Sequence, residues 1–202
     1  MLRKAIMLVG VLLLVTLGAI AQEQRSEISL QGTGFFTKDS SGNRISQTAT
    51  DTGGFLTGYR YRLNRWVSAQ ADYGFSRNTQ EYFAPLANSR VQSDVHQATG
   101  GLVFNLPVPA RVKLSPYLLA EGGALVFNPT GNRGGAVPGA DTQAKGLFVY
   151  GGGADFPVTN HVSLRTEYRG LVYGEPDFGR RNLRTSSMTH TAQPSVGIAF
   201  HF

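Results

Sequence analysis

Hydrophobic and polar residues alternate along most of this chain. The alternation is clearest in the last nine residues, 194–202. There Pro194, Val196, Ile198, Phe200 and Phe202 fall on one face, and Ser195, Gly197, Ala199 and His201 on the other. A period of two predicts a β-strand with one apolar face. Because apolar surroundings do not tolerate an open sheet edge, we expect this last strand to pair with the first.

The same alternation marks seven further segments. They are residues 28–37, 53–62, 67–76, 95–106, 117–127, 146–156 and 162–172. Strands of about 9–12 residues cross a bilayer at a tilt. The seven connections alternate long and short, the short ones lying near residues 64–65, 107–115 and 157–161. We therefore predict an all-β fold: an eight-stranded antiparallel up-and-down transmembrane β-barrel with short periplasmic turns and long extracellular loops.

Alternation alone does not tell which face points outward, since a soluble barrel of the lipocalin type has its apolar face inside. Three features favour an apolar exterior. The polar face is rich in Gly, Ser and Ala, which suits the narrow interior of eight strands. Aromatic residues gather near both ends of the predicted strands, as in the girdles of membrane barrels. The chain also ends on the ring of Phe202.

The first 21 residues have the pattern of a secretory signal peptide. Arg3 and Lys4 precede an apolar run over residues 5–17, and Ala19-Ile20-Ala21 forms an A-x-A cleavage site. We expect cleavage after Ala21, which leaves residues 22–202 as the barrel domain. The alternative is an uncleaved anchor, for which the apolar run is short.

Composition excludes several classes of function. The formal net charge is +6, but the basic residues are scattered and form no block typical of nucleic-acid binding. The absence of cysteine excludes disulfides and thiolate metal sites. The four histidines are also scattered, so we expect no metal site and no cofactor.

The layout of residues 28–202 resembles the small eight-stranded outer-membrane barrels of the OmpA-like, OmpX-like and opacity-protein group. The closing Val196, Ile198, Phe200 and Phe202 resemble the C-terminal signal read by the barrel-assembly machinery. The resemblance implies an integral, porin-like protein of a Gram-negative outer membrane in contact with lipid and lipopolysaccharide. A peptidoglycan-binding domain is missing, and we expect a monomer. Functions in this group vary, so the resemblance does not select one.

Eight charged residues lie on the predicted inward face: Arg60, Arg62, Asp72, Glu121, Asp155, Arg165, Glu167 and Arg169. Four are positive and four negative. We expect them to pair, since an unpaired buried charge is costly, with Asp155 and Arg165 meeting as diagonal neighbours. One interpretation is a structural plug that fills the barrel; the other is a gated ion path closed by salt bridges.

Two of the long loops carry candidate contact residues. Arg180, Arg181 and Arg184 are suited to lipopolysaccharide phosphates, which guanidinium groups bind through two hydrogen bonds. The alternative is a solvated loop of mixed charge. The polar stretch 77–94 contains the aromatic residues Tyr82 and Phe83. They predict either a partner contact or packing on the barrel's own rim.

An enzyme is the remaining alternative, because some small outer-membrane barrels modify lipid A. His161-Val162-Ser163 resembles the lipid A deacylases in spacing, yet the predicted topology puts it at the periplasmic end, turns Ser163 inward and aims no carboxylate at His161. His190, near Ser186 and Ser187 at the outer rim, lacks an orienting acid. We therefore expect no catalytic residues and a structural or surface-interaction role, with a lipid A-modifying enzyme and a narrow gated pore as alternatives.

Overall fold

The computed structural model describes residues 25–38, 40–42, 45–84, 87–109, 111, 113–130, 141–174, 176 and 188–202. Residues 1–21, for which the sequence predicts a signal peptide, lie outside this set. In the part of the chain that is described, no helix is long and apolar enough to span a membrane.

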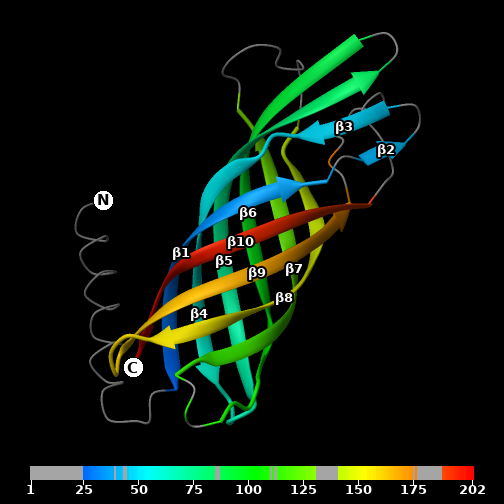
Figure 1. Ribbon diagram of the computed structural model, residues 1–202. Coiled ribbons are helices and arrows are strands. Elements are labelled where there is room, and N and C mark those ends of the chain that lie inside the picture. Colours follow the sequence, from blue (N-terminus) through cyan, green and yellow to red (C-terminus); the bar gives the residue numbers. More distant parts are fainter. Residues whose placement is uncertain are drawn as a thin grey trace, which may run out of the picture.

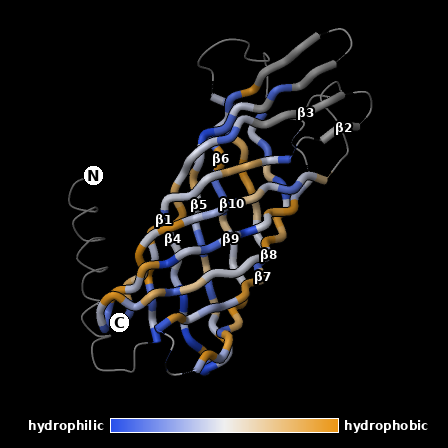
Figure 2. The backbone as a smooth tube through the Cα atoms, in the orientation of Figure 1, coloured by the Kyte–Doolittle hydropathy of each residue, from blue (hydrophilic) through white to orange (hydrophobic). Residues whose placement is uncertain are grey.

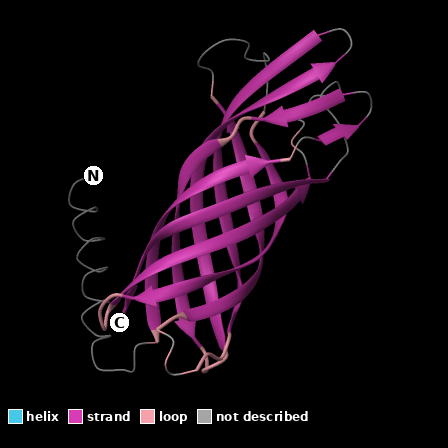
Figure 3. Ribbon diagram, in the orientation of Figure 1, coloured by secondary structure: helices cyan, strands magenta, loops and turns pink. Residues whose placement is uncertain are grey.

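Eight long strands form the body of the molecule, and two short strands lie at one end (Figures 1 and 3). The long strands are β1 (Ser26–Thr37), β4 (Thr52–Arg62), β5 (Val67–Ala84), β6 (Ala87–Asn105), β7 (Ser115–Pro129), β8 (Gln143–Pro157), β9 (Val162–Gly174) and β10 (Met188–His201). The short strands are β2 (Ser40–Gly42) and β3 (Ile45–Ala49). All neighbouring strands run antiparallel, which confirms the predicted fold class.

The first and last strands close the barrel. β1 pairs with β10 from Glu27 opposite His201 to Thr37 opposite Thr191. Beyond that register, the backbone N–H of Ser26 donates to the carbonyl of Phe202 at 3.1 Å, and the N–H of Phe202 donates back at 2.9 Å. Because β5 also pairs with β6, the eight long strands form a complete ring. The predicted pairing of the C-terminal strand with the first strand is confirmed.

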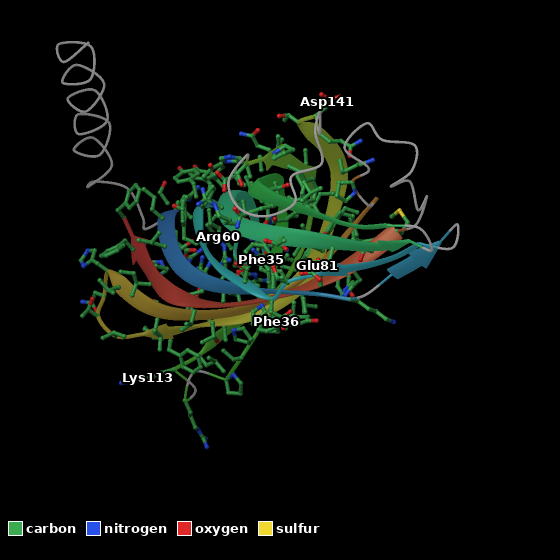
Figure 4. All side chains as sticks on the ribbon, turned by 90° about the horizontal axis from the view of Figure 1, so that it is seen from above. Phe35, Phe36, Arg60, Glu81, Lys113 and Asp141 are labelled. Atoms are coloured by element: carbon green, nitrogen blue, oxygen red, sulfur yellow. The ribbon has the colours of Figure 1, made fainter. Side chains whose placement is uncertain are left out.

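The apolar face points outward, as the sequence predicts. Hydrophobic and hydrophilic residues alternate along the strands in Figure 2. Phe36 is 49% exposed on the outside, while its neighbour Phe35 is only 6% exposed on the inside (Figure 4). The outer surface carries large side chains of every barrel strand, including Leu30, Tyr59, Tyr73, Phe104, Leu118, Phe148, Tyr168 and Ile198. Such a surface is stable where it meets lipid rather than water.

Short side chain-to-backbone hydrogen bonds hold two of the tight turns. The side-chain oxygen of Asn64 accepts from the N–H groups of Trp66 and Val67 at 2.8 and 2.9 Å, between β4 and β5. Between β8 and β9, the hydroxyl of Thr159 accepts from the N–H of Val162 at 3.0 Å. Asn and Thr are common turn residues because their side chains bond nearby backbone in this way. We call this end of the barrel the short-turn end and the opposite one the long-loop end.

The structure differs from the prediction at the long-loop end. The sequence suggests a loop over residues 77–94, but β5 continues to Ala84 and β6 begins at Ala87, with pairing up to Ala84 opposite Ala87. β3 adds to the edge of β5, and β2 pairs with β3. These four strands form a sheet that projects beyond the barrel, which we call the raised sheet (Figure 1). Residues 77–94 are mostly polar and lack a sustained alternation of hydrophobic and polar positions, so the sequence of this hairpin looks like a loop.

Candidate functional site

The barrel interior near the short-turn end is filled with paired charges. Seven of the eight predicted interior residues are buried: Arg60, Asp72, Glu121, Asp155, Arg165, Glu167 and Arg169. Each lies on the inward face of its strand because of the period of two. Burial of so many ionisable groups is stable only where they pair with one another. The structure brings these seven residues into one network.

Arg165 organises the part of the network closest to the short-turn end. Its guanidinium donates two hydrogen bonds of 2.7 Å to the carboxylate of Asp155 and a further one to Glu27. Asp155 stands directly opposite Arg165 in the β8–β9 register rather than diagonally. A two-pronged bond between guanidinium and carboxylate fixes both side chains in one orientation.

Arg60 connects this group to the middle of the barrel. Its Nε donates to the side-chain oxygen of Gln70 at 2.6 Å, and its guanidinium lies 4.1 Å from the ring centroid of Tyr117. The hydroxyl of Tyr117 donates to Glu167 at 2.6 Å. A cation over a desolvated aromatic face is a favourable contact. Tyr117 therefore contacts the cation of Arg60 with its ring and the carboxylate of Glu167 with its hydroxyl.

Arg169 is the centre of the innermost group and is fully buried. It forms ion pairs with Glu121, with Asp72 at 3.0 Å and with Glu167 at 3.7 Å. It also donates to the hydroxyl of Thr99 at 3.3 Å. One guanidinium group thus contacts carboxyl groups from three other positions in the barrel wall.

The predicted balance of four positive against four negative charges does not hold. Arg62 is exposed at the short-turn mouth, where it is the last residue of β4. Glu27, which lies one residue before the predicted first strand, is buried and pairs with Arg165 and Arg60. The buried network therefore contains three guanidinium groups and five carboxyl groups. Glu27 was detectable because it continues the inward parity of β1.

Inward-facing apolar side chains also gather between the network and the long-loop end, and we call them the apolar layer. They are Phe35, Val91, Val95, Leu125, Phe127, Leu147, Leu171 and Tyr173, part of a larger buried cluster. Buried polar side chains such as Ser76, Ser93 and Thr191 lie among them. The rings of Phe127 and Tyr173 lie 6.0 Å apart between centroids. The sequence suggests an inward face of charged and small residues, so this apolar layer was not predicted. These residues lie at the inward positions of their strands, whereas most of the large hydrophobic side chains lie at the outward positions.

A polar cavity of about 210 Å³ opens at the short-turn mouth. Glu27, Ser163 and His201 line it, and they are hydrogen-bonded in a row. Ser163 and the Nε2 of His201 lie 2.9 Å apart, and the Nδ1 of His201 lies 3.2 Å from Glu27. Ser163 thus contacts His201 rather than His161, which is exposed in the neighbouring turn. The pairing of β10 with β9 sets Ala199 opposite Ser163, so His201 is a diagonal neighbour of Ser163.

Two histidines near the long-loop end bond to tyrosines on the outer surface. His190 and Tyr150 lie 2.9 Å apart, and His96 and Tyr73 lie 2.7 Å apart. Ser186 and Ser187, which the sequence places near His190, lie outside the described residues. The same is true of Arg180, Arg181 and Arg184, the predicted lipopolysaccharide contacts.

At the base of the raised sheet, Arg77 and Asp94 form an exposed ion pair with bonds of 2.6 and 3.0 Å. The hydrogen bonds from Arg77 lower the pKa of the Asp94 carboxyl below its ordinary value. Within the described ranges, no three His, Cys, Asp or Glu side chains are arranged to hold a metal ion.

Comparison with solved structures agrees with this architecture. The outer membrane protein OprG from Pseudomonas aeruginosa is similar with a TM-score of 0.62 and 11% identity, over 90% of this chain and 97% of that one. Neisserial surface protein A has a TM-score of 0.58 and 17% identity, over 87% and 97% of the two chains. The outer membrane protein AlkL has a TM-score of 0.56 and 12% identity, over 90% and 91%. At such identities the likeness concerns the fold alone.

A search of curated protein sequences finds no significant match. The family model for the outer membrane protein beta-barrel domain, however, matches residues 7–202. That match spans nearly the whole chain and includes all eight long strands, the closing β1–β10 pair and the paired charges inside. The closed ring with an apolar exterior and the family match lead to the same conclusion: this chain belongs to the family of outer membrane protein β-barrel domains of bacteria.

Proposed function

We propose that this outer-membrane barrel has a structural and surface-interaction role, and that the raised sheet makes the surface contact. The observation that carries the proposal is the filled interior. The charged network and the apolar layer occupy the barrel in series, and eight strands enclose too little space for a wide channel. A barrel of this kind acts through its surfaces.

The raised sheet is the structural feature best suited to such a contact. β5 and β6 are the longest strands, with 18 and 19 residues, and both continue beyond the ring. The ion pair between Arg77 and Asp94 lies where they leave it. A paired hairpin with β2 and β3 at its edge presents a defined surface, unlike an unpaired loop. Adhesion, membrane integrity and lipopolysaccharide contact are the candidate roles for it.

Shortening the hairpin tests this role. Glu81 stands opposite Arg90 in the register, so residues 82–89 can be replaced by Asn-Gly, which forms a two-residue hairpin turn and keeps the buried Val91. We expect the shortened protein to remain a folded barrel, with a heat-dependent shift on a detergent gel, but to lose binding to lipopolysaccharide vesicles or host cells. Wild-type binding by the shortened protein would contradict the role of the raised sheet.

The lipopolysaccharide contact through Arg180, Arg181 and Arg184 is a separate part of the proposal. Three guanidinium groups on a loop of the outer side would meet lipid A phosphates. Replacing all three with Gln should weaken binding to lipopolysaccharide vesicles more than to phospholipid vesicles. Equal loss for both would assign the effect to general charge.

The C-terminal strand is proposed as the contact with the assembly machinery. Val196, Ile198 and Phe200 face outward on β10, next to the terminal Phe202. Replacing Phe202 with Ser should lower the amount of folded protein in the outer membrane while refolding of the purified chain in detergent is unchanged. If refolding falls equally, Phe202 acts in stability instead.

The surface role requires no catalysis, and we propose none at the outer leaflet. His96 and His190, the described histidines near the long-loop end, each bond to a tyrosine. A lipid A-modifying enzyme would need a nucleophile, a base and an orienting acid within reach of one another there. Mass spectra of lipid A that are identical with and without the protein are the expected result.

A further inference from the structure

We propose that Ser163, His201 and Glu27 form an activated serine at the periplasmic mouth, able to hydrolyse short acyl esters that carry a negative charge. This inference is independent of the surface role, because the three residues lie at the opposite end of the barrel from the raised sheet.

The geometry has the order that nucleophilic catalysis requires. The Oγ of Ser163 lies 2.9 Å from the Nε2 of His201, and the Nδ1 of the same ring lies 3.2 Å from Oε2 of Glu27. A nucleophile within hydrogen-bond reach of a base, and the base held by a third group, is the arrangement that activates a serine. The three residues come from β9, β10 and β1, so only closure of the barrel brings them together.

The charges around Glu27 determine which ring nitrogen carries the proton. Glu27 contacts two guanidinium groups, those of Arg165 and Arg60, which favour its ionised form. An ionised carboxylate only accepts hydrogen bonds, so the Nδ1 of His201 must be the donor. In the neutral imidazole, Nε2 then carries no proton and accepts a hydrogen bond from the hydroxyl of Ser163. This is the tautomer in which histidine acts as a general base.

The surrounding cavity supplies space and positive charge. It measures about 210 Å³, and Ser163, His201, Glu27, Arg60 and Arg62 all line it. Arg60 is buried in the wall of this cavity, where its guanidinium group pairs with Glu27 and Asp155. Fixed positive charge near the reacting ester stabilises the oxyanion that forms when the ester is attacked. The exposed Arg62 favours a substrate with an anionic group, and the small volume favours a short acyl chain.

The reaction balances without a further reagent. Ser163 attacks the carbonyl carbon of the ester, its proton passes to Nε2 of His201, and that proton goes to the departing alcohol as the ester C–O bond breaks. Water then loses a proton to His201 and attacks the acyl group on Ser163. The products are an alcohol and a carboxylic acid, and Ser163 regains its hydroxyl proton.

The test uses the full barrel, folded in detergent and checked by its heat-dependent gel shift. Diisopropyl fluorophosphate should add one phosphoryl group per chain, located at Ser163 by peptide mass spectrometry, with release of fluoride. Ser163→Ala should remove the adduct, and His201→Asn should slow labelling at least about 100-fold. Ser68→Ala is the matched control, because Ser68 lines the same cavity but accepts its hydrogen bond from Asn105.

Absence of an adduct at Ser163, or labelling of His201→Asn at the wild-type rate, would overturn the proposal and leave a purely structural row of hydrogen bonds.

A second experiment measures turnover with p-nitrophenyl acetate and the p-nitrophenyl half-ester of succinic acid. We expect faster hydrolysis of the anionic ester, and loss of this preference in Arg62→Gln. Equal rates for the two esters in the wild type would overturn the substrate class.

Glu27 acts here as a positioning residue, and nitrogen NMR separates this role from simple support of the fold. In the wild type, the ¹⁵N shifts of His201 should report a protonated Nδ1 and an unprotonated Nε2. In Glu27→Gln the other tautomer should increase and labelling should slow, while the gel shift is retained. An unchanged tautomer with slowed labelling would contradict the positioning role.

Discussion

Arg169 illustrates how single residues in the interior act through their neighbours. It is fully buried and is the cation that faces Glu121, Asp72 and Glu167 together. Removing one partner of a buried ion pair leaves an uncompensated charge, which costs far more than the pair itself contributes. The contribution of Arg169 to stability is therefore best measured by replacing it.

We predict that Arg169→Met destabilises the barrel by about 3–5 kcal/mol, the usual cost of breaking a buried ion pair. Unfolding in urea, followed by the loss of the compact gel band, measures the change. Arg77→Met is the matched control, since Arg77 pairs with Asp94 in solvent, where ion pairs contribute little. Equal destabilisation by the two substitutions would show that burial does not govern the network.

At this scale the sequence predicted which residues enter the interior but not how they pair. Parity alone placed Arg60, Glu121, Asp155 and Arg169 inward. The contact of Arg60 with the ring of Tyr117 and that of Arg169 with Glu121 span the barrel, and they depend on tilt and stagger that one chain's alternation does not specify. Glu27 was missed because the predicted first strand began one residue later.

At the scale of elements, the close approach of β1 and β10 depends on Gly197. A Cβ at this position would overlap the carbonyl oxygen of Leu30 and crowd Gln31, both backbone of the facing strand. Only glycine allows the two strands to pair so tightly at the point where the barrel closes. Gly122, on the outer face of β7, has open space at the corresponding position.

Gly197→Ala should therefore cost about 1–3 kcal/mol, as expected where an added methyl group forces backbone to move. Gly122→Ala should leave stability nearly unchanged. Both substitutions add the same methyl group, so urea unfolding of the pair isolates the effect of the closing strands. If the two variants unfold at the same urea concentration, the seam between β1 and β10 is more adaptable than its geometry indicates.

The elements themselves were predictable in proportion to their contact with lipid. β1, β4 and β9 carry outward aromatic or aliphatic residues at many alternate positions, and their predicted ranges lie within two residues of the observed ones. β10 begins six residues before the predicted last strand. The raised sheet was not predicted because residues 77–94 are mostly polar and carry few hydrophobic residues at alternate positions. A polar segment such as residues 77–94 is compatible with either a loop or a hairpin, and the local sequence does not distinguish these two structures.

For the whole molecule, the arrangement of the interior bears on the choice between a plug and a gate. A gate held by salt bridges alone would open when they are removed. Here the apolar layer around Leu125, Phe127 and Tyr173 lies between the charged network and the long-loop end. Close-packed apolar side chains exclude water and ions. A path for ions through the barrel would therefore have to pass this cluster as well as the charged network.

We predict that Arg165→Ala combined with Arg169→Ala lowers stability without opening a conducting path. Single-channel recordings in planar bilayers should show no discrete steps for the wild type or for this double variant. Adding Leu125→Ser and Phe127→Ser should admit water to the second layer and produce small steps, provided the gel shift shows a folded barrel. Conductance from the double variant alone would instead identify the salt bridges as a gate and would overturn the assignment of the interior as a plug. An ion must pass both the charged network and the apolar layer. The first variant in the series that conducts therefore distinguishes a plug from a gate closed by salt bridges.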